Sequence, residues 1–191
     1  HAFQGPGPFR VELTAVNGHG ASTAVHEVPV LSLGMPTPSS TVIPAAAHLD
    51  GLSDTRWRSD LVLATTSVGG TAVDALLFFL PQGGDNTLAR GARVAVPTLL
   101  RLADVVAGAL AAGDEAGAIL IASERPLVVS SRTYTDGPDG SYGQAVPAVR
   151  QTEVLGYGEV ASLLLLEETT DFRSNVGAVN LTGAPAELEL A

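Results

Sequence analysis

Short runs in which apolar and polar residues alternate, separated by turn-forming residues, recur along nearly the whole chain. The first run alternates apolar residues from Phe9 onward with Arg10, Glu12 and Thr14, and NGHGAS then separates it from a second run, TAVHEVPVL. A period of two places alternate residues on one face of a strand. Turn residues between such runs are typical of antiparallel hairpins. We therefore expect an all-β protein of the immunoglobulin-like or β-sandwich type.

The same pattern predicts most of the other elements. Further strands are expected at 41–46, 56–65, 71–80, 92–97, 116–122, 127–135, 142–149, 160–167, 173–181 and 186–190. Only LLRLADVVAGALAAG has helical spacing, because Leu99, Leu102, Val106 and Leu110 follow one another at three or four positions. Gly113 is a plausible C-terminal stop. We expect one short helix near 99–111 that caps one end of the sandwich.

An internal repeat organises the chain. WRSD, which begins at Trp57, is echoed by FRSN at Phe172, and VIPAAAH at Val42 is echoed by AVPAVRQ at Ala145. After each aromatic-Arg-Ser motif come a strand, a glycine-containing turn and a second strand, and landmarks that recur in the same order indicate a repeat. We expect a partial β unit over 1–31, a Pro/Ser/Thr linker over 32–41, a β-sandwich unit over 42–149, and the start of a second, incomplete copy over 150–191.

Two resemblances accompany this organisation. Residues 1–31 resemble the C-terminal strands of a PKD-type domain, an immunoglobulin-like sandwich, at His1, Phe3, Gly7, Phe9, Val11, Leu13, Val16, Asn17, Gly20, Ser22, Thr23 and Val28. Residues 42–191 resemble a poorly characterised β-rich module repeated in tandem in bacterial extracellular proteins, on IPAAAH, RWRSDLVL, VAVP, LADVV and PLVVSSRTYTDGPDGSYGQAVPAV. The resemblances imply an architectural protein, extracellular or at the cell surface.

Composition excludes several classes of function. The formal charge is −10, which argues against sequence-blind binding to nucleic acid or to anionic membranes. Cysteine and lysine are both absent, so disulfides, thiol catalysis, Schiff-base chemistry and a P-loop lysine are excluded. The longest apolar stretch, LVLATTSVGGTAVDALLFFL, contains Asp74 and two glycines, so we expect no membrane insertion.

Acidic turns are the main candidates for a metal site. Calcium loops place oxygen ligands at closely alternating positions around a glycine. TDGPDGSYG offers Asp136 and Asp139, and HLDGLSDTRWRSD offers Asp50, Asp54 and Asp60. Asp-Gly sequences are also ordinary turn formers. We expect plain turns at both places and no cofactor, with calcium as the weaker alternative.

The repeated motif is the main candidate for a functional cluster. It comprises Trp57, Arg58 and Asp60, which recur as Phe172, Arg173 and Asn175. In a strand, Arg58 and Asp60 share one face and Trp57 lies on the other. A residue repeated with its unit serves the unit's fold more often than a ligand. We expect the arginine to tie the strand to a neighbouring loop by hydrogen bonds, with a ligand-binding fork as the alternative.

Three classes of function remain. The first is a non-catalytic extracellular structural or adhesive protein, either a filament subunit or part of a large tandem-repeat surface protein. Incomplete β units expose strand edges, which other copies or flanking domains of the same polypeptide would cover by strand addition. The second class, kept as the alternative, is a carbohydrate-binding accessory module of a secreted hydrolase. Such a module stacks exposed aromatic rings on sugars, and this chain has one Trp and three Tyr for that purpose.

The third class is an enzyme. An N-terminal histidine chelates copper in the lytic polysaccharide monooxygenases, which makes His1 a weak copper candidate, although HAF also fits the PKD pattern. The chain shows no nucleophile elbow and no spaced acid–base set. We therefore expect no catalysis.

Overall fold

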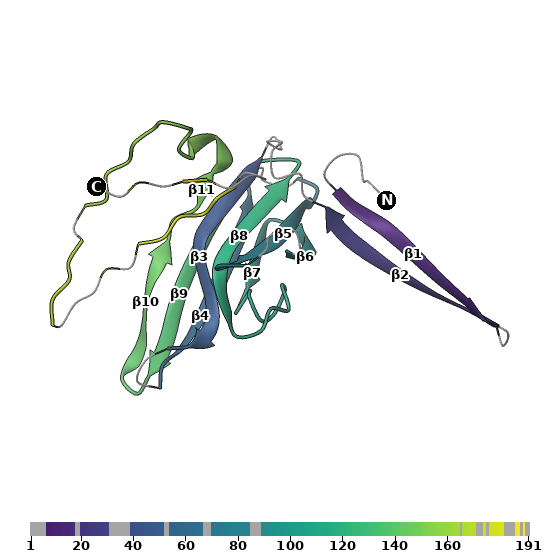
Figure 1. Ribbon diagram of the computed structural model, residues 1–191, viewed down its shortest axis with the longest axis horizontal. Coiled ribbons are helices and arrows are strands. Elements are labelled where there is room, and N and C mark those ends of the chain that lie inside the picture. The colour runs from purple at the N-terminus through teal and green to yellow at the C-terminus, as the bar shows by residue number, and fades with distance from the viewer. Residues whose placement is uncertain are drawn as a thin grey trace.

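The computed structural model describes residues 7–17, 20–30, 39–51, 54–66, 70–84, 89–164, 166–170, 174, 176–181, 186–187 and 189, with side chains from residue 39 onward. Strands β1 (Gly7–Asn17) and β2 (Gly20–Val30) form an antiparallel hairpin of their own, in which Phe9 is the register partner of Val28. The hairpin extends away from the rest of the molecule (Figure 1).

Nine further strands form one continuous antiparallel sheet. They are β3 (Ser40–Asp50), β4 (Arg56–Thr65), β5 (Val73–Pro81), β6 (Arg90–Val96), β7 (Leu99–Leu102), β8 (Glu115–Ser123), β9 (Leu127–Gly137), β10 (Gly140–Val146) and β11 (Val149–Arg150). A 3-10 turn at Gln151–Glu153 follows. The protein is all-β, and the predicted strands between residues 9 and 146 are confirmed, with ends shifted by a few residues.

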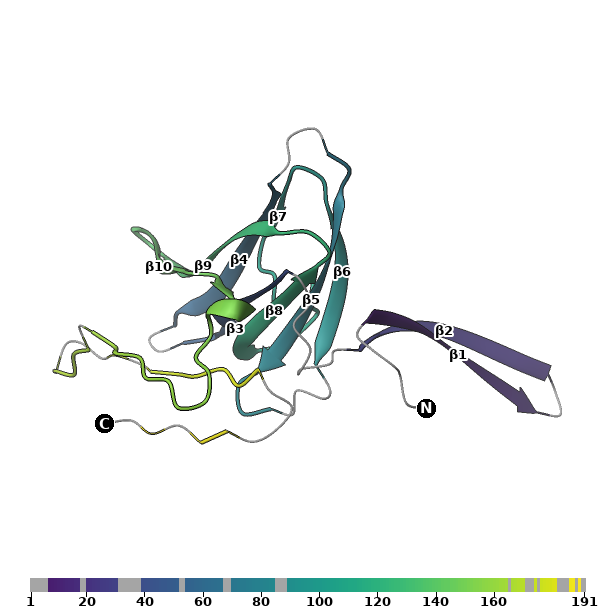
Figure 2. The same cartoon turned by 90° about the horizontal axis from the view of Figure 1, so that it is seen from above.

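The sheet folds over on itself to make a sandwich (Figure 2). One layer holds β3, β8, β5 and β6 in that order, with β11 on β3, and the other holds β10, β9, β4 and β7. The layers are joined where β3 and β4 pair, at Leu49 with Trp57 and at Asp50 with Arg56, before the two strands separate.

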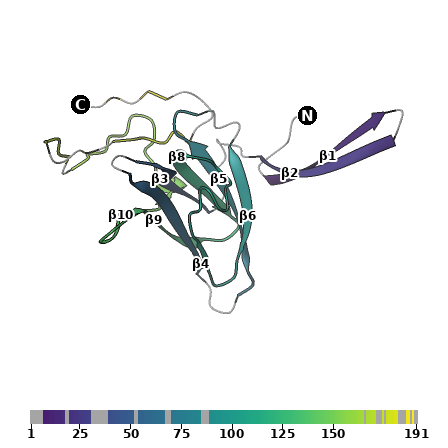
Figure 3. The ribbon, with the colours of Figure 1, turned by 90° about the horizontal axis from the view of Figure 1, so that it is seen from below.

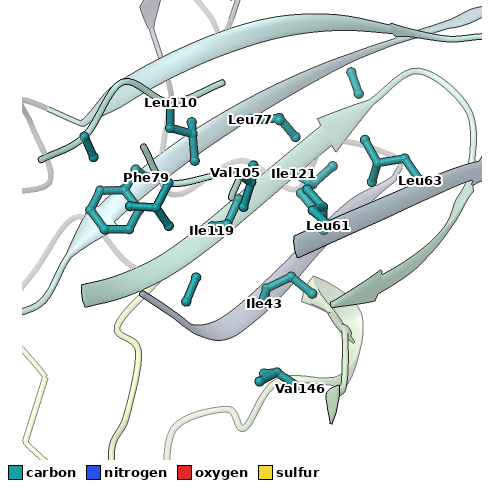
Figure 4. Packing of buried hydrophobic residues seen from close by; sticks show 14 of the residues in the cluster. Ile43, Leu61, Leu63, Leu77, Phe79, Val105, Leu110, Ile119, Ile121 and Val146 are labelled. Atoms are coloured by element: carbon teal, nitrogen blue, oxygen red, sulfur yellow. The ribbon is translucent and has the colours of Figure 1, made fainter. Parts of the chain in front are cut away.

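The main core fills the space between the layers (Figure 4). Leu61 and Leu63 of β4 lie in the same cluster as Ile119 and Ile121 of β8, and each of the four is at most 1% exposed. Alternate residues of a strand face the same way, so the period-two pattern places the apolar side chains of each strand on the face that meets the other layer.

A second apolar cluster lies on the outer face of the β3–β8–β5 layer. It comprises Val42, Phe78, Leu80, Ala118 and Leu120, and Val179 and Leu181 of the C-terminal segment pack against it. Figure 3 shows this segment running beside β3, β8 and β5. Both faces of β5 are therefore covered, which explains why ALLFFL is apolar without alternation.

The short helix predicted near 99–111 is wrong. Residues 99–102 form β7, which pairs with β4 from Leu61↔Leu102 to Ala64↔Leu99, and residues 103–110 are successive turns. Asp104 has φ 44° and Ala111 has φ 47°, values that interrupt a right-handed helix. The apolar spacing instead reflects burial of Val105, Val106 and Leu110 in the main core.

The strands predicted at 160–167, 173–181 and 186–190 are also wrong for the described residues, none of which belongs to a strand. A strand needs a neighbour to accept and donate its backbone hydrogen bonds. Alternation of apolar and polar residues in these segments matches the sequence pattern of a strand, but it does not provide a neighbouring strand to pair with.

Candidate functional site

Arg58 and Tyr134 form the centre of a polar cluster on the outer face of the β9–β4 layer. They are register partners, and the Arg58 guanidinium carbon lies 5.6 Å from the centroid of the Tyr134 ring. The Arg132 guanidinium carbon lies 4.8 Å from the same ring. Arg58 also forms an ion pair with Asp136, which is on β9 rather than in a loop. Its charge is thus already compensated within the sheet.

Asp60 is the carboxylate with the most hydrogen-bond partners in the same cluster. Its Oδ2 accepts from Arg101 of β7 at 2.7 Å, and its Oδ1 accepts from the Asp104 backbone N–H at 3.0 Å and from the Tyr134 hydroxyl at 3.4 Å. The residue is only 8% exposed. Asp60 therefore ties β4 to β7, to the turn after β7, and to β9.

These contacts set the direction of two pKa shifts. Burial alone raises the Asp60 pKa, but the Arg101 hydrogen bond, the Asp104 N–H and the Arg101 charge together hold that pKa below its ordinary value. Burial, and then the neighbouring Asp60 charge, raises the pKa of Tyr134 above its ordinary value. At neutral pH Asp60 is therefore charged and Tyr134 neutral, which matches a hydroxyl that donates to a carboxylate.

A second polar network closes the end of the sandwich where β3 meets β4. His48 Nδ1 lies 2.8 Å from Asp104 Oδ2, and His48 Nε2 lies 2.7 Å from Arg56 NH2. Arg56 also donates to Asp50 at 2.6 Å and to Asp114 at 2.7 Å. The hydrogen bonds that Arg56 donates to these two carboxylates, the one to Asp50 first, raise the Arg56 pKa.

The contacts of His48 determine what this network can do. A neutral imidazole with its proton on Nδ1 donates to Asp104 and accepts from Arg56 at Nε2, which satisfies both ring nitrogens. A His–carboxylate pair acts as a general base only when its outer nitrogen faces a proton donor to be activated. Here His48 Nε2 already accepts a hydrogen bond from the Arg56 guanidinium. The network therefore links β3, β4 and the turns after β7.

Three of the aspartates considered as calcium ligands each form an ion pair with a different arginine. Asp50, Asp60 and Asp136 pair with Arg56, Arg101 and Arg58 respectively. Among the residues that the structure describes, no three side chains of the metal-binding types gather closely enough to hold an ion. Calcium at Asp136 and Asp139 thus gains no ligand set from these residues, and His1, the copper candidate, lies outside them.

The remaining motif residues divide in the same way. Trp57 is half-buried, and a Cβ placed on Gly51 would lie 2.5 Å from the indole Nε1, so the ring lies directly over the Gly51 backbone. Phe172, Arg173 and Asn175 lie outside the described residues. Sequence reasoning singled out Arg58 and Asp60 but missed Arg101, Arg132 and Tyr134 as their partners, because nothing local in the sequence marks them.

The C-terminal part holds an exposed apolar segment, residues 154–166, of which all but 165 are described. None of those described residues belongs to a strand. The large apolar side chains that the structure describes in this segment are exposed to solvent: Val154 40%, Leu155 54%, Tyr157 109%, Val160 90%, Leu163 57%, Leu164 81% and Leu166 55%. Most of the exposed large apolar side chains among the described residues therefore lie in this one segment.

Four of the described strands form the open edges of the two layers, β6 and β11 in one and β10 and β7 in the other. β6 carries Arg90 and Arg93, β7 has only four residues and β11 only two. β10, with the sequence GSYGQAV, has seven residues, no charge, and exposure at every position before Val146. Charged or very short edge strands resist pairing with other chains, whereas long uncharged ones invite it.

Comparison with known proteins provides no family for this chain. No family model, no curated protein and no solved structure matches it. Among the residues described, no helix is both long and apolar enough to cross a membrane.

Proposed function

We propose that this chain is a non-catalytic extracellular structural or adhesive protein that assembles through β-strand addition, as a filament subunit or as part of a larger tandem-repeat surface protein. The observation that carries the proposal is the exposed apolar segment 154–166, which belongs to no strand among its described residues.

The energetic reason is the apolar surface that the segment leaves in water. Val160 is 90% exposed and Leu164 81%. Full burial of an aliphatic side chain of this kind stabilises a protein by about 1.5–3 kcal/mol. Contiguous exposed apolar surface of this kind marks interaction sites. Pairing as a strand would bury these side chains and satisfy the backbone at the same time.

The polar clusters support a structural role rather than a reaction centre. Asp60, Arg58 and Arg56 each connect two or more strands or turns of the sandwich, and His48 has both ring nitrogens engaged. Such ties hold the two layers in one arrangement. A rigid body with an exposed apolar extension suits a building block.

The partners that we propose are other copies of the chain or flanking domains of the same polypeptide. Contact between an extension on one copy and a sheet edge on the next is heterologous, and heterologous contacts that do not close into a ring build open chains. The resemblance to tandem modules of extracellular proteins points to the cell exterior as the place of assembly.

Light scattering over a concentration series, followed by electron microscopy, tests the proposal. We expect the average molar mass of the particles to rise with protein concentration. Leu163→Ser/Leu164→Ser should reduce that rise without changing the melting temperature, because both side chains are exposed. Leu99→Ser/Val128→Ser is the matched control, since Leu99 is 61% and Val128 59% exposed on the sandwich itself. A wild-type chain that stays monomeric throughout contradicts the proposal.

A further inference from the structure

We propose that the outer edge of β10 is the acceptor of strand addition and that residues 160–166 of a second copy are the strand it accepts. This inference rests on the proposed function and names the two surfaces involved. It follows from the register of β10, from the composition of the competing edges, and from the match between the two segments.

The register shows which backbone groups of β10 are open. Gly137 and Gly140 flank a two-residue turn and are the first register pair of the β9–β10 hairpin. The pair beside a two-residue turn is hydrogen-bonded, and hydrogen-bonded pairs then alternate along the ladder. The N–H and C=O groups of Ser141, Gly143 and Ala145 therefore point away from β9, toward the open side.

The competing edges are less suitable. On β6, Arg93 pairs with Asp74 and Arg90 with Glu115, so an incoming apolar strand would meet charged pairs along that edge. β7 offers only four residues and β11 only two. β10 offers seven residues without charge, and lies at the side of the sandwich away from the β1–β2 hairpin (Figure 1).

The donor matches this edge in length and charge. Residues 160–166, VASLLLL, number seven, as does β10, and contain no charged residue. Glu159 precedes them and Glu167 follows. Arg132 lies over β10, where its guanidinium donates to Ser141 Oγ at 2.7 Å. This arginine near the first residues of the acceptor complements a glutamate at an end of the donor.

The donor also lies away from β10 in its own molecule. Figures 1 and 2 both show the C-terminal chain leaving the sandwich beyond β11 without joining the β10 edge. A second copy is accordingly the occupant that we assign to this edge.

Peptide binding to the full 191-residue chain tests the assignment. The receptor carries Leu164→Pro, which removes one backbone N–H from its own residues 160–166 and so weakens their ability to pair as a strand. The probe is a labelled peptide of residues 159–168, EVASLLLLEE. We expect the peptide to bind, and a scrambled peptide of the same composition not to bind. Adding Ala145→Pro to the receptor removes one outward N–H and should weaken binding about tenfold, whereas Ala145→Ser, which keeps that N–H, should not.

The outcomes separate this inference from the proposed function. If wild-type chains assemble but Ala145→Pro chains assemble equally and bind the peptide equally, the β10 assignment is wrong and strand addition at another edge stands. If wild-type chains stay monomeric and the receptor binds no peptide, both are wrong. Near-ultraviolet circular dichroism of each variant verifies that the sandwich remains folded.

Discussion

Replacement of Asp60 by alanine should destabilise the sandwich far more than replacement of an exposed aspartate. Asp60 is 8% exposed and accepts hydrogen bonds from three different elements. Loss of the acceptor for the Asp104 N–H costs about 1–3 kcal/mol, and loss of the charge-assisted bonds adds to it. We expect a total decrease in the free energy of unfolding of about 3 kcal/mol.

The matched control is Asp74→Ala. Asp74 is 51% exposed on its side chain and forms one ion pair with Arg93, itself 52% exposed. A pair of this kind is screened by water, so the control should change the free energy of unfolding by no more than about 0.5 kcal/mol. Urea unfolding followed by circular dichroism measures both variants, provided that the dependence on urea is the same for each.

The pH dependence gives a second readout for Asp60. Its folded-state pKa is lowered below the ordinary value of 3.8, so its contribution to stability is fully present above about pH 4 and is lost as the pH falls through the lowered folded value. The difference in stability between wild type and Asp60→Ala should therefore shrink in acid. A difference that is already as small as that of Asp74→Ala at neutral pH would refute the reasoning.

Three further outcomes follow from the packing. Gly117→Ala should lower the free energy of unfolding by about 1–3 kcal/mol in urea, because its Cβ would lie 2.2 Å from a backbone oxygen of β5. Val179→Ser/Leu181→Ser should cost about 1–2 kcal/mol in the same assay, since both side chains cover the outer cluster, while Val176→Ser, 46% exposed, should have little effect. Trp57 emission should be partly accessible to acrylamide and unchanged by oligosaccharides, and a sugar-dependent change would instead favour a carbohydrate-binding module.

Strand positions were predictable because alternation is a local property. Each of the runs from Phe9 to Val146 contains enough period-two pattern and enough flanking turn residues to mark a strand without knowledge of its neighbours. The helical spacing from Leu99 to Leu110 failed as a signal because burial, rather than helical geometry, produced it. The pairing of β7 with β4 and the bond from Asp104 N–H to Asp60 use backbone that a helix would need.

By itself the sequence determined an all-β fold, the location of most of its strands between residues 9 and 146, and the absence of cysteine and lysine chemistry. Tertiary structure alone decided which polar residues meet. Asp60 and Arg101 are 41 positions apart, and His48 and Asp104 are 56 apart. It also decided that Val179 and Leu181 cover the outer face of β5. These contacts depend on how the sheet folds over between β3 and β4, and that is a property of long-range packing that no local pattern encodes.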